Sequence, residues 1–166
     1  MKSRGQKLSL YGLALFVLGF GVALSVAQSA APDNGPGSAL AIPQADLMQP
    51  EALLPLLKST AADRPLVLQV GSHVLFTEAH IAGSEYVGPG SQAAGLQALR
   101  ERVAKLPNDK AIVLYCGCCP WGRCPNMGPA FRLLRELGFT RVKALYLASN
   151  LGTDWVDKGY PVERGH

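Results

Sequence analysis

Short, nearly continuous apolar runs recur along the chain at residues 66–70, 111–115 and 142–147. Each run is flanked by polar or turn-forming residues. Uninterrupted hydrophobicity over so few residues is typical of strands that are buried on both faces. A further short strand is predicted at 85–87. Because strands covered on both sides belong mostly to parallel sheets, the runs predict a parallel sheet.

Apolar residues between these runs recur with the period of an amphipathic helix. The positions are Leu96, Leu99, Val103 and Leu106 in one segment, and Met127, Ala130, Phe131, Leu134 and Leu137 in another. Gly138 follows the second segment, where a helix commonly ends in a left-handed residue, and Gly159 does the same for a short helix predicted at 154–158. Another helix is predicted at 50–58. The alternation of strands and helices predicts an α/β fold with helices on both faces of the sheet.

The first 27 residues have the pattern of a secretory signal. Lys2, Arg4 and Lys7 precede an uncharged stretch at 8–26, and the small residues at 25–27 suit cleavage by a signal peptidase. If it is not cleaved, the uncharged stretch is long enough to anchor the chain in a membrane. The positively charged end stays inside, so both outcomes place the remainder outside the cytoplasm, in the bacterial periplasm or secreted.

The remainder divides into a spacer and one domain. Residues 28–44 are rich in Pro, Gly, Ser and Ala and show no periodicity, which predicts a flexible spacer. Residues 45–166 then form a single domain. The formal charge of +4 depends on the three basic residues of the signal, and 13 basic and 12 acidic residues remain without them. This balance predicts no nucleic-acid partner, and membrane contact only where the N-terminal segment is uncleaved.

All four cysteines lie in residues 116–124, CGCCPWGRC, which we call the cysteine loop. The loop lies between the strand predicted at 111–115 and the following helix. In a parallel sheet, ligands collect at the carboxyl ends of the strands, and the first turn of the next helix offers unpaired N–H groups. A sulfur placed there is stabilised as the thiolate, so Cys116 is the predicted nucleophile. Asn126 is the predicted N-cap of that helix.

The rest of the loop is predicted to bind the substrate. The candidate residues are Gly117, Cys118, Cys119, Pro120, Trp121, Gly122 and Arg123. We expect loop amides to surround an anion held on Cys116. Arg123 adds a fixed positive charge with planar donors that suit sulfonate or sulfate oxygens.

A set of segments from residue 66 to 165 has a distinctive order and spacing. The segments are 69–70 (QV), 78–84 (EAHIAGS), 112–116 (IVLYC), 133–142 (LLRELGFTRV) and 154–163 (DWVDKGYPVE). Together they resemble a rhodanese-like (sulfurtransferase) domain. The resemblance implies a central, mostly parallel sheet of about five strands with helices on both faces. It also implies that Cys116 accepts a sulfane sulfur as a persulfide and that His80 makes a structural hydrogen bond.

The sequence departs from the family pattern at three places. Gln69-Val70-Gly71 stands where Asp-Val-Arg is common, so an ion pair expected there is missing. Asn150-Leu151 replaces paired glycines that face the active site. In the common loop, Cys is followed by two residues, Gly, one residue and Arg, whereas six residues separate Cys116 from Arg123 here. We therefore expect an enlarged or reshaped pocket.

The reaction implied by the resemblance moves sulfane sulfur from a small sulfur-containing anion, such as thiosulfate, to a thiol or protein acceptor. The Cys116 thiolate attacks the outer sulfur, while loop amides and Arg123 hold the leaving anion. The reaction requires no organic cofactor and no metal.

The same cysteines leave other functions open. Cys118, Cys119 and Cys124 are candidate resolving or disulfide-forming thiols, because an exported protein can form disulfides, although a bond between the adjacent Cys118 and Cys119 is strained. Cys116 and Cys119 also form a C-x-x-C pair, which is typical of thiol–disulfide redox sites. Three or four thiolates so close together can hold Cu⁺ or Zn²⁺. A non-catalytic interaction module is a further alternative.

Overall fold

Five parallel strands form the central sheet of the protein. The structure, a computed structural model, describes residues 42–60, 62 and 64–165. The strand order is β1-β6-β5-β2-β4, and every neighbouring pair is parallel. The strands are β1 (Leu47–Met48), β2 (Leu66–Gln69), β4 (Glu85–Tyr86), β5 (Ile112–Tyr115) and β6 (Val142–Leu145). A separate antiparallel pair joins β3 (His80–Ile81) to β7 (Val162–Glu163).

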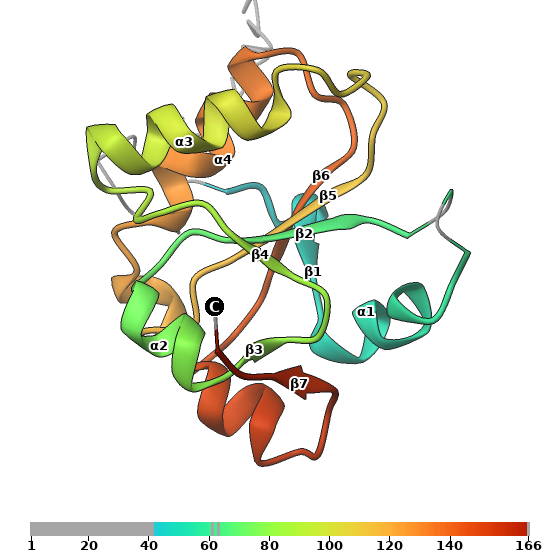
Figure 1. Cartoon of the computed structure of the whole chain (residues 1–166), viewed down its shortest axis with the longest axis vertical. Coiled ribbons are helices and arrows are strands. Elements are labelled where there is room, and N and C mark those ends of the chain that lie inside the picture. The colour runs from blue at the N-terminus through green and yellow to red at the C-terminus, as the bar shows by residue number, and fades with distance from the viewer. Residues whose placement is uncertain (1–41, 61, 63, 166) are drawn as a thin grey trace, which may run out of the picture. The chain divides into compact units, whose positions relative to one another are not determined.

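Helices cover both faces of this sheet (Figure 1). The α-helices are α1 (Pro50–Leu57), α2 (His73–Glu78), α3 (Ala93–Val103) and α4 (Met127–Glu136). Shorter elements are two 3₁₀-helices (Gln44–Asp46 and Trp121–Arg123) and a π-helix, Gly152–Val156. Helices α3 and α4 pack on one face, whereas α1 and the π-helix pack on the other.

Strand β5 lies at the centre of the sheet, and its side chains alternate between two hydrophobic clusters. Ile112 and Leu114 lie in the cluster beneath α3 and α4. Val113 and Tyr115 lie in the opposite cluster, with Trp155 of the π-helix. Because successive side chains of a strand point to opposite faces, the next residue, Cys116, lies on the α3–α4 side.

The predicted α/β class and the helices on both faces are confirmed, and the three long apolar runs are central strands. Gly138 and Gly159 have positive φ angles of 88° and 72°, as predicted for residues that end helices. The last helix differs from its prediction: it is a π-helix that begins at Gly152. Helix α2 and strands β1, β3 and β7 were not predicted.

The predicted signal at 1–27 and residues 28–41 of the predicted spacer lie outside the described residues. The spacer's last residues, 42–44, are described, and Ile42 is buried against the core. Across the described segments, no helix combines the length and the apolar character needed to span a bilayer.

Candidate active site

Cys116 lies directly after β5, at the carboxyl end of the central strand, and β2 holds it there. The Gln69 side chain, at the end of β2, donates a hydrogen bond from Nε2 to the Cys116 carbonyl oxygen over 3.1 Å. Gly71 follows closely. A Cβ atom at Gly71 would lie 2.7 Å from the Cys116 carbonyl oxygen and 3.0 Å from its Sγ. A glycine is therefore required there by the close approach of the backbone to Cys116.

The next residue, Gly117, is fixed by the segment that precedes the π-helix. Its φ angle of 77° lies in the left-handed region, which favours glycine. The Gly117 carbonyl accepts a hydrogen bond from the Leu151 N–H at 3.0 Å, and a Cβ on Gly117 would lie 2.9 Å from the Leu151 Cβ. The start of the cysteine loop is thus held from two sides.

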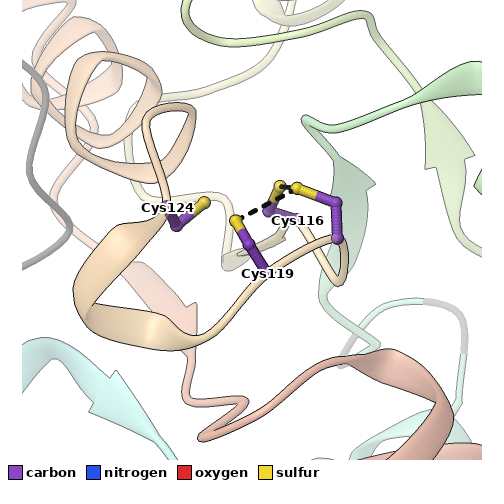
Figure 2. A group of neighbouring side chains, drawn as sticks. Cys116, Cys119 and Cys124 are labelled. Atoms are coloured by element: carbon purple, nitrogen blue, oxygen red, sulfur yellow. Dashed lines mark hydrogen bonds between the residues drawn. The ribbon is translucent and has the colours of Figure 1, made fainter.

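The four cysteine sulfurs converge in one place, although the cysteines are spread over the loop. All four Sγ atoms lie within 4.8 Å of one another. The shortest contacts join Cys116 to Cys118 at 3.0 Å and Cys118 to Cys119 at 3.2 Å. Figure 2 shows the Cys119 and Cys124 sulfurs turned toward Cys116. All four are free cysteines.

Asn126 connects this cluster to the rest of the domain. Its Nδ2 donates to Cys116 Sγ at 3.2 Å and points toward Cys118 Sγ at 3.9 Å, while its Oδ1 accepts from the Ser91 N–H at 3.0 Å. Asn126 occupies the predicted N-cap position of α4, but its side chain makes no capping hydrogen bond to that helix. The side chain instead donates to the sulfurs.

The contacts among the four thiols shift their pKa values in opposite directions. Hydrogen bonds from Cys116 and Cys124 lower the pKa of the Cys118 thiol. The hydrogen bond to Cys118 raises the pKa of Cys116, and burial raises the pKa of Cys119. The pKa of Cys124 is also raised: its hydrogen bond from Cys116 acts to lower it, but the hydrogen bond to Cys118 and burial outweigh that effect.

These pKa directions favour Cys118, rather than the predicted Cys116, as the cysteine that ionises first. Cys116 is also nearly covered, with 4% of its surface exposed, whereas Cys118 is half-buried. The sequence alternative that paired Cys116 with Cys119 also changes, since the closest sulfur to Cys116 is that of Cys118.

Two cavities meet at the cysteines. The larger, about 300 Å³, has Cys116, Gly117 and Cys118 in its wall, together with Gln69, Leu75, Glu78, Ala79, Asn150, Leu151, Gly152 and Val156. The smaller, about 10 Å³, is bounded by Cys116, Gly117, Cys119, Trp121, Cys124, Met127, Leu145 and Leu147. Cys116 lines both cavities and can therefore be reached from the larger one.

No protein-family model and no curated protein matches the sequence. Solved structures do match. The solution structure of the rhodanese-like domain of the Alr3790 protein from Anabaena sp. superposes with a TM-score of 0.52 at 22% identity, covering 72% of this chain and 79% of that one. A crystal structure of the Alr3790 protein gives a TM-score of 0.52 at 24% identity, over 71% of this chain and 92% of that one. The fold is rhodanese-like.

The predicted substrate-binding residues of the cysteine loop fall into two groups: some line a cavity and the others are exposed. Gly117, Cys118, Cys119 and Trp121 line one or both cavities. Pro120, Gly122 and Arg123 are exposed and, among the described residues, belong to the wall of neither cavity. The prediction that Arg123 holds an anion beside Cys116 is therefore not supported, because the lengthened loop carries Arg123 out into solvent.

The side chains of Trp121 and His80 make packing contacts within the domain. Trp121 packs its ring against Tyr146 with a centroid distance of 5.4 Å. His80 Nδ1 lies 2.8 Å from the Phe76 carbonyl oxygen, and its ring stacks on the Phe76 ring, as the structural interpretation predicted.

Sequence reasoning named Gln69, Gly71 and Asn126 but missed that they hold Cys116 in position. One of them has a recognisable signal. Gln69 interrupts the apolar run at 66–70, and a polar side chain in a fully buried strand requires a hydrogen-bond partner. Its partner is the Cys116 carbonyl, 47 positions away in sequence.

Proposed function

We propose that this domain transfers sulfane sulfur and that Cys116 carries it. The proposal depends on one observation: Cys116 lies at the carboxyl end of the central strand, in the wall of a cavity of about 300 Å³, with a second sulfur 3.0 Å away. Catalytic groups of parallel α/β sheets collect at this edge. The rhodanese-like fold supports a sulfurtransferase type of domain.

The transfer takes place in two displacements. Cys116 Sγ lies 3.0 Å from Cys118 Sγ, so Cys116 can give up its proton to the Cys118 thiolate as it attacks. A bond forms between Cys116 Sγ and the outer sulfur of the donor. The donor's own bond to that sulfur breaks, and the leaving group takes the electron pair. An acceptor thiolate or cyanide then attacks the outer sulfur and releases the Cys116 thiolate. No external oxidant or reductant takes part.

The cavity wall bears on the choice of donor. Its one ionisable side chain besides the cysteines is Glu78, and none of its described lining residues is a lysine or arginine. A dianion such as thiosulfate finds no countercharge there, so a small organic persulfide with one negative charge or none suits the wall better. The acceptor remains a thiol or protein nucleophile. We also propose that residues 1–27 direct the protein to the periplasm or to secretion.

Intact-mass measurement tests the proposal directly. The reduced protein is incubated with thiosulfate or with a small organic persulfide, and then with cyanide. We expect the protein to gain the mass of one sulfur atom, and a larger fraction of the protein to gain it from the persulfide than from thiosulfate. Cyanide should remove this sulfur and release thiocyanate. Cys116→Ser abolishes the gain, whereas Gly122→Ala, a change in the same loop with no atom within 4 Å of the new Cβ, leaves it intact.

Two results oppose the proposal. A full, cyanide-labile mass gain in Cys116→Ser excludes Cys116 as the carrier. If Cys118→Ser alone loses the gain, the sulfur is carried on Cys118, the cysteine with the lowered pKa.

A further inference from the structure

The cysteine loop brings together more sulfur than one persulfide carrier needs. A carrier requires one sulfur, and a dithiol redox pair requires two. Here four thiols from nine consecutive residues have their Sγ atoms within 4.8 Å of one another. The loop that accomplishes this is lengthened, and a tight turn at Gly117 and the 3₁₀-helix Trp121–Arg123 return Cys124 to the cluster.

The spacing of the sulfurs suits a metal ion. Four thiolates around Zn²⁺ at a Zn–S distance of about 2.3 Å are separated by roughly 3.8 Å in a tetrahedral arrangement. The contacts in the cluster begin at 3.0 Å and none of the sulfur pairs exceeds 4.8 Å, so this value lies within the observed range. Each sulfur–sulfur distance then has to change by no more than about 1 Å.

The small cavity between the sulfurs has the size and the lining that a soft cation requires. Its volume of about 10 Å³ accommodates a single atom. Three of the four cysteines bound it, and its other described walls are Gly117, Trp121, Met127, Leu145 and Leu147. No carboxylate or imidazole side chain lines it among the described residues, so the site offers sulfur and excludes the oxygen ligands that Mg²⁺ and Ca²⁺ prefer.

The surroundings also supply donors for the sulfurs. Asn126 Nδ2 donates to Cys116 Sγ at 3.2 Å and lies 3.9 Å from Cys118 Sγ. Hydrogen bonds of this kind orient the sulfur ligands of a metal and offset their negative charge.

We propose that Cys116, Cys118, Cys119 and Cys124 bind one thiophilic d¹⁰ cation, Zn²⁺ or Cu⁺. Binding replaces S–H bonds with metal–sulfur bonds and releases the thiol protons to solvent. No electron is transferred. This proposal goes beyond sulfur transfer and does not depend on it.

Anaerobic titration of the reduced protein tests the site, first with Cd²⁺ as a spectroscopic substitute. We expect a thiolate-to-metal charge-transfer absorption that saturates at one equivalent. Zn²⁺ and Cu⁺ are then titrated in competition with chromophoric chelators. Gly122→Ala binds as the wild type does, whereas Cys119→Ser and Cys124→Ser bind at least about tenfold more weakly.

All four cysteines are ligands in this proposal, so each of the four serine variants should bind Zn²⁺ or Cu⁺ more weakly than the wild type does.

Two outcomes overturn the proposal. One is the absence of saturable binding of all three cations by a protein in which four free thiols have been counted. The other is unchanged affinity in the double variant Cys119→Ser/Cys124→Ser. Far-ultraviolet circular dichroism of each variant shows that it is folded, and the wild-type titration alone already tests the site. Neither outcome affects the mass gain expected of Cys116, so failure of the metal site and failure of sulfur transfer are distinguishable.

Discussion

Substitution of Gly71 by alanine tests how closely the backbone approaches Cys116. A Cβ at Gly71 would lie 2.7 Å from the Cys116 carbonyl oxygen, which is about 0.7 Å closer than the 3.4 Å at which ordinary contact begins. That oxygen cannot move freely, because it accepts the hydrogen bond from Gln69. Gly71 has no positive φ, so the penalty is steric alone.

We expect Gly71→Ala to lower the free energy of unfolding by about 1–3 kcal/mol, the usual cost of overpacking a buried position. The measurement is urea denaturation followed by circular dichroism. Gly122→Ala is the control, since its Cβ meets no atom within 4 Å. It also corrects for the entropy that any glycine-to-alanine change removes from the unfolded chain.

The same substitution acts on the sulfur. The added Cβ would lie 3.0 Å from Cys116 Sγ, so a displaced Cys116 should also take up less sulfane sulfur from a persulfide donor. If Gly71→Ala matches Gly122→Ala within about 0.5 kcal/mol and in sulfur uptake, the close approach described here is incorrect.

Three further substitutions test other contacts. Gly117→Ala should lower the free energy of unfolding measured by urea denaturation by about 1–3 kcal/mol, because its φ is 77° and the new Cβ would lie 2.9 Å from the Leu151 Cβ. Asn126→Leu should lose about 1–3 kcal/mol in the same assay, because the Ser91 N–H loses its acceptor. Hydrogen bonding to an arginine of α3 lowers the pKa of Glu85 below its ordinary value of 4.5, so this carboxylate stabilises the fold above that pH and loses its effect as the pH falls. Glu85→Gln should therefore be less stable than wild type at pH 7 by at most about 1 kcal/mol, and this difference in thermal denaturation should shrink as the pH falls below 4.5.

The sequence predicted the central sheet well because the sheet is covered on both sides. Every residue of β5 is buried, so the strand appears in the sequence as an unbroken apolar run. Helix α2 gives no such signal. Two of its apolar residues, Val74 and Leu75, are exposed at 64% and 38%, so its hydrophobic pattern does not mark a buried face. Strands β3 and β7 have two residues each, too few for any periodicity.

The candidate site was predictable only where it is local. The four cysteines occupy one loop, so their proximity follows from the sequence. Their order of ionisation does not, because it depends on which sulfurs touch: hydrogen bonding to Cys116 and Cys124 lowers the pKa of Cys118, whereas the hydrogen bond to Cys118 raises the pKa of Cys116. The role of Asn126 could not be predicted without the tertiary structure, because its side-chain Oδ1 accepts a hydrogen bond from the N–H of Ser91, 35 positions away.

Metal binding and sulfur transfer require the same atom, Cys116 Sγ, so each should exclude the other. A Cys116 sulfur that shares an electron pair with a cation is a weaker nucleophile toward a donor, and the outer sulfur of a Cys116 persulfide competes with the cation for space beside the other three sulfurs. Protein loaded with one equivalent of Cd²⁺ should therefore show no mass gain from a persulfide donor, and a chelator should restore the gain. If the fully loaded protein gains sulfur while retaining its charge-transfer absorption, the cation and the sulfane sulfur occupy different cysteines. In that case Cys116 cannot serve both as a ligand and as the carrier.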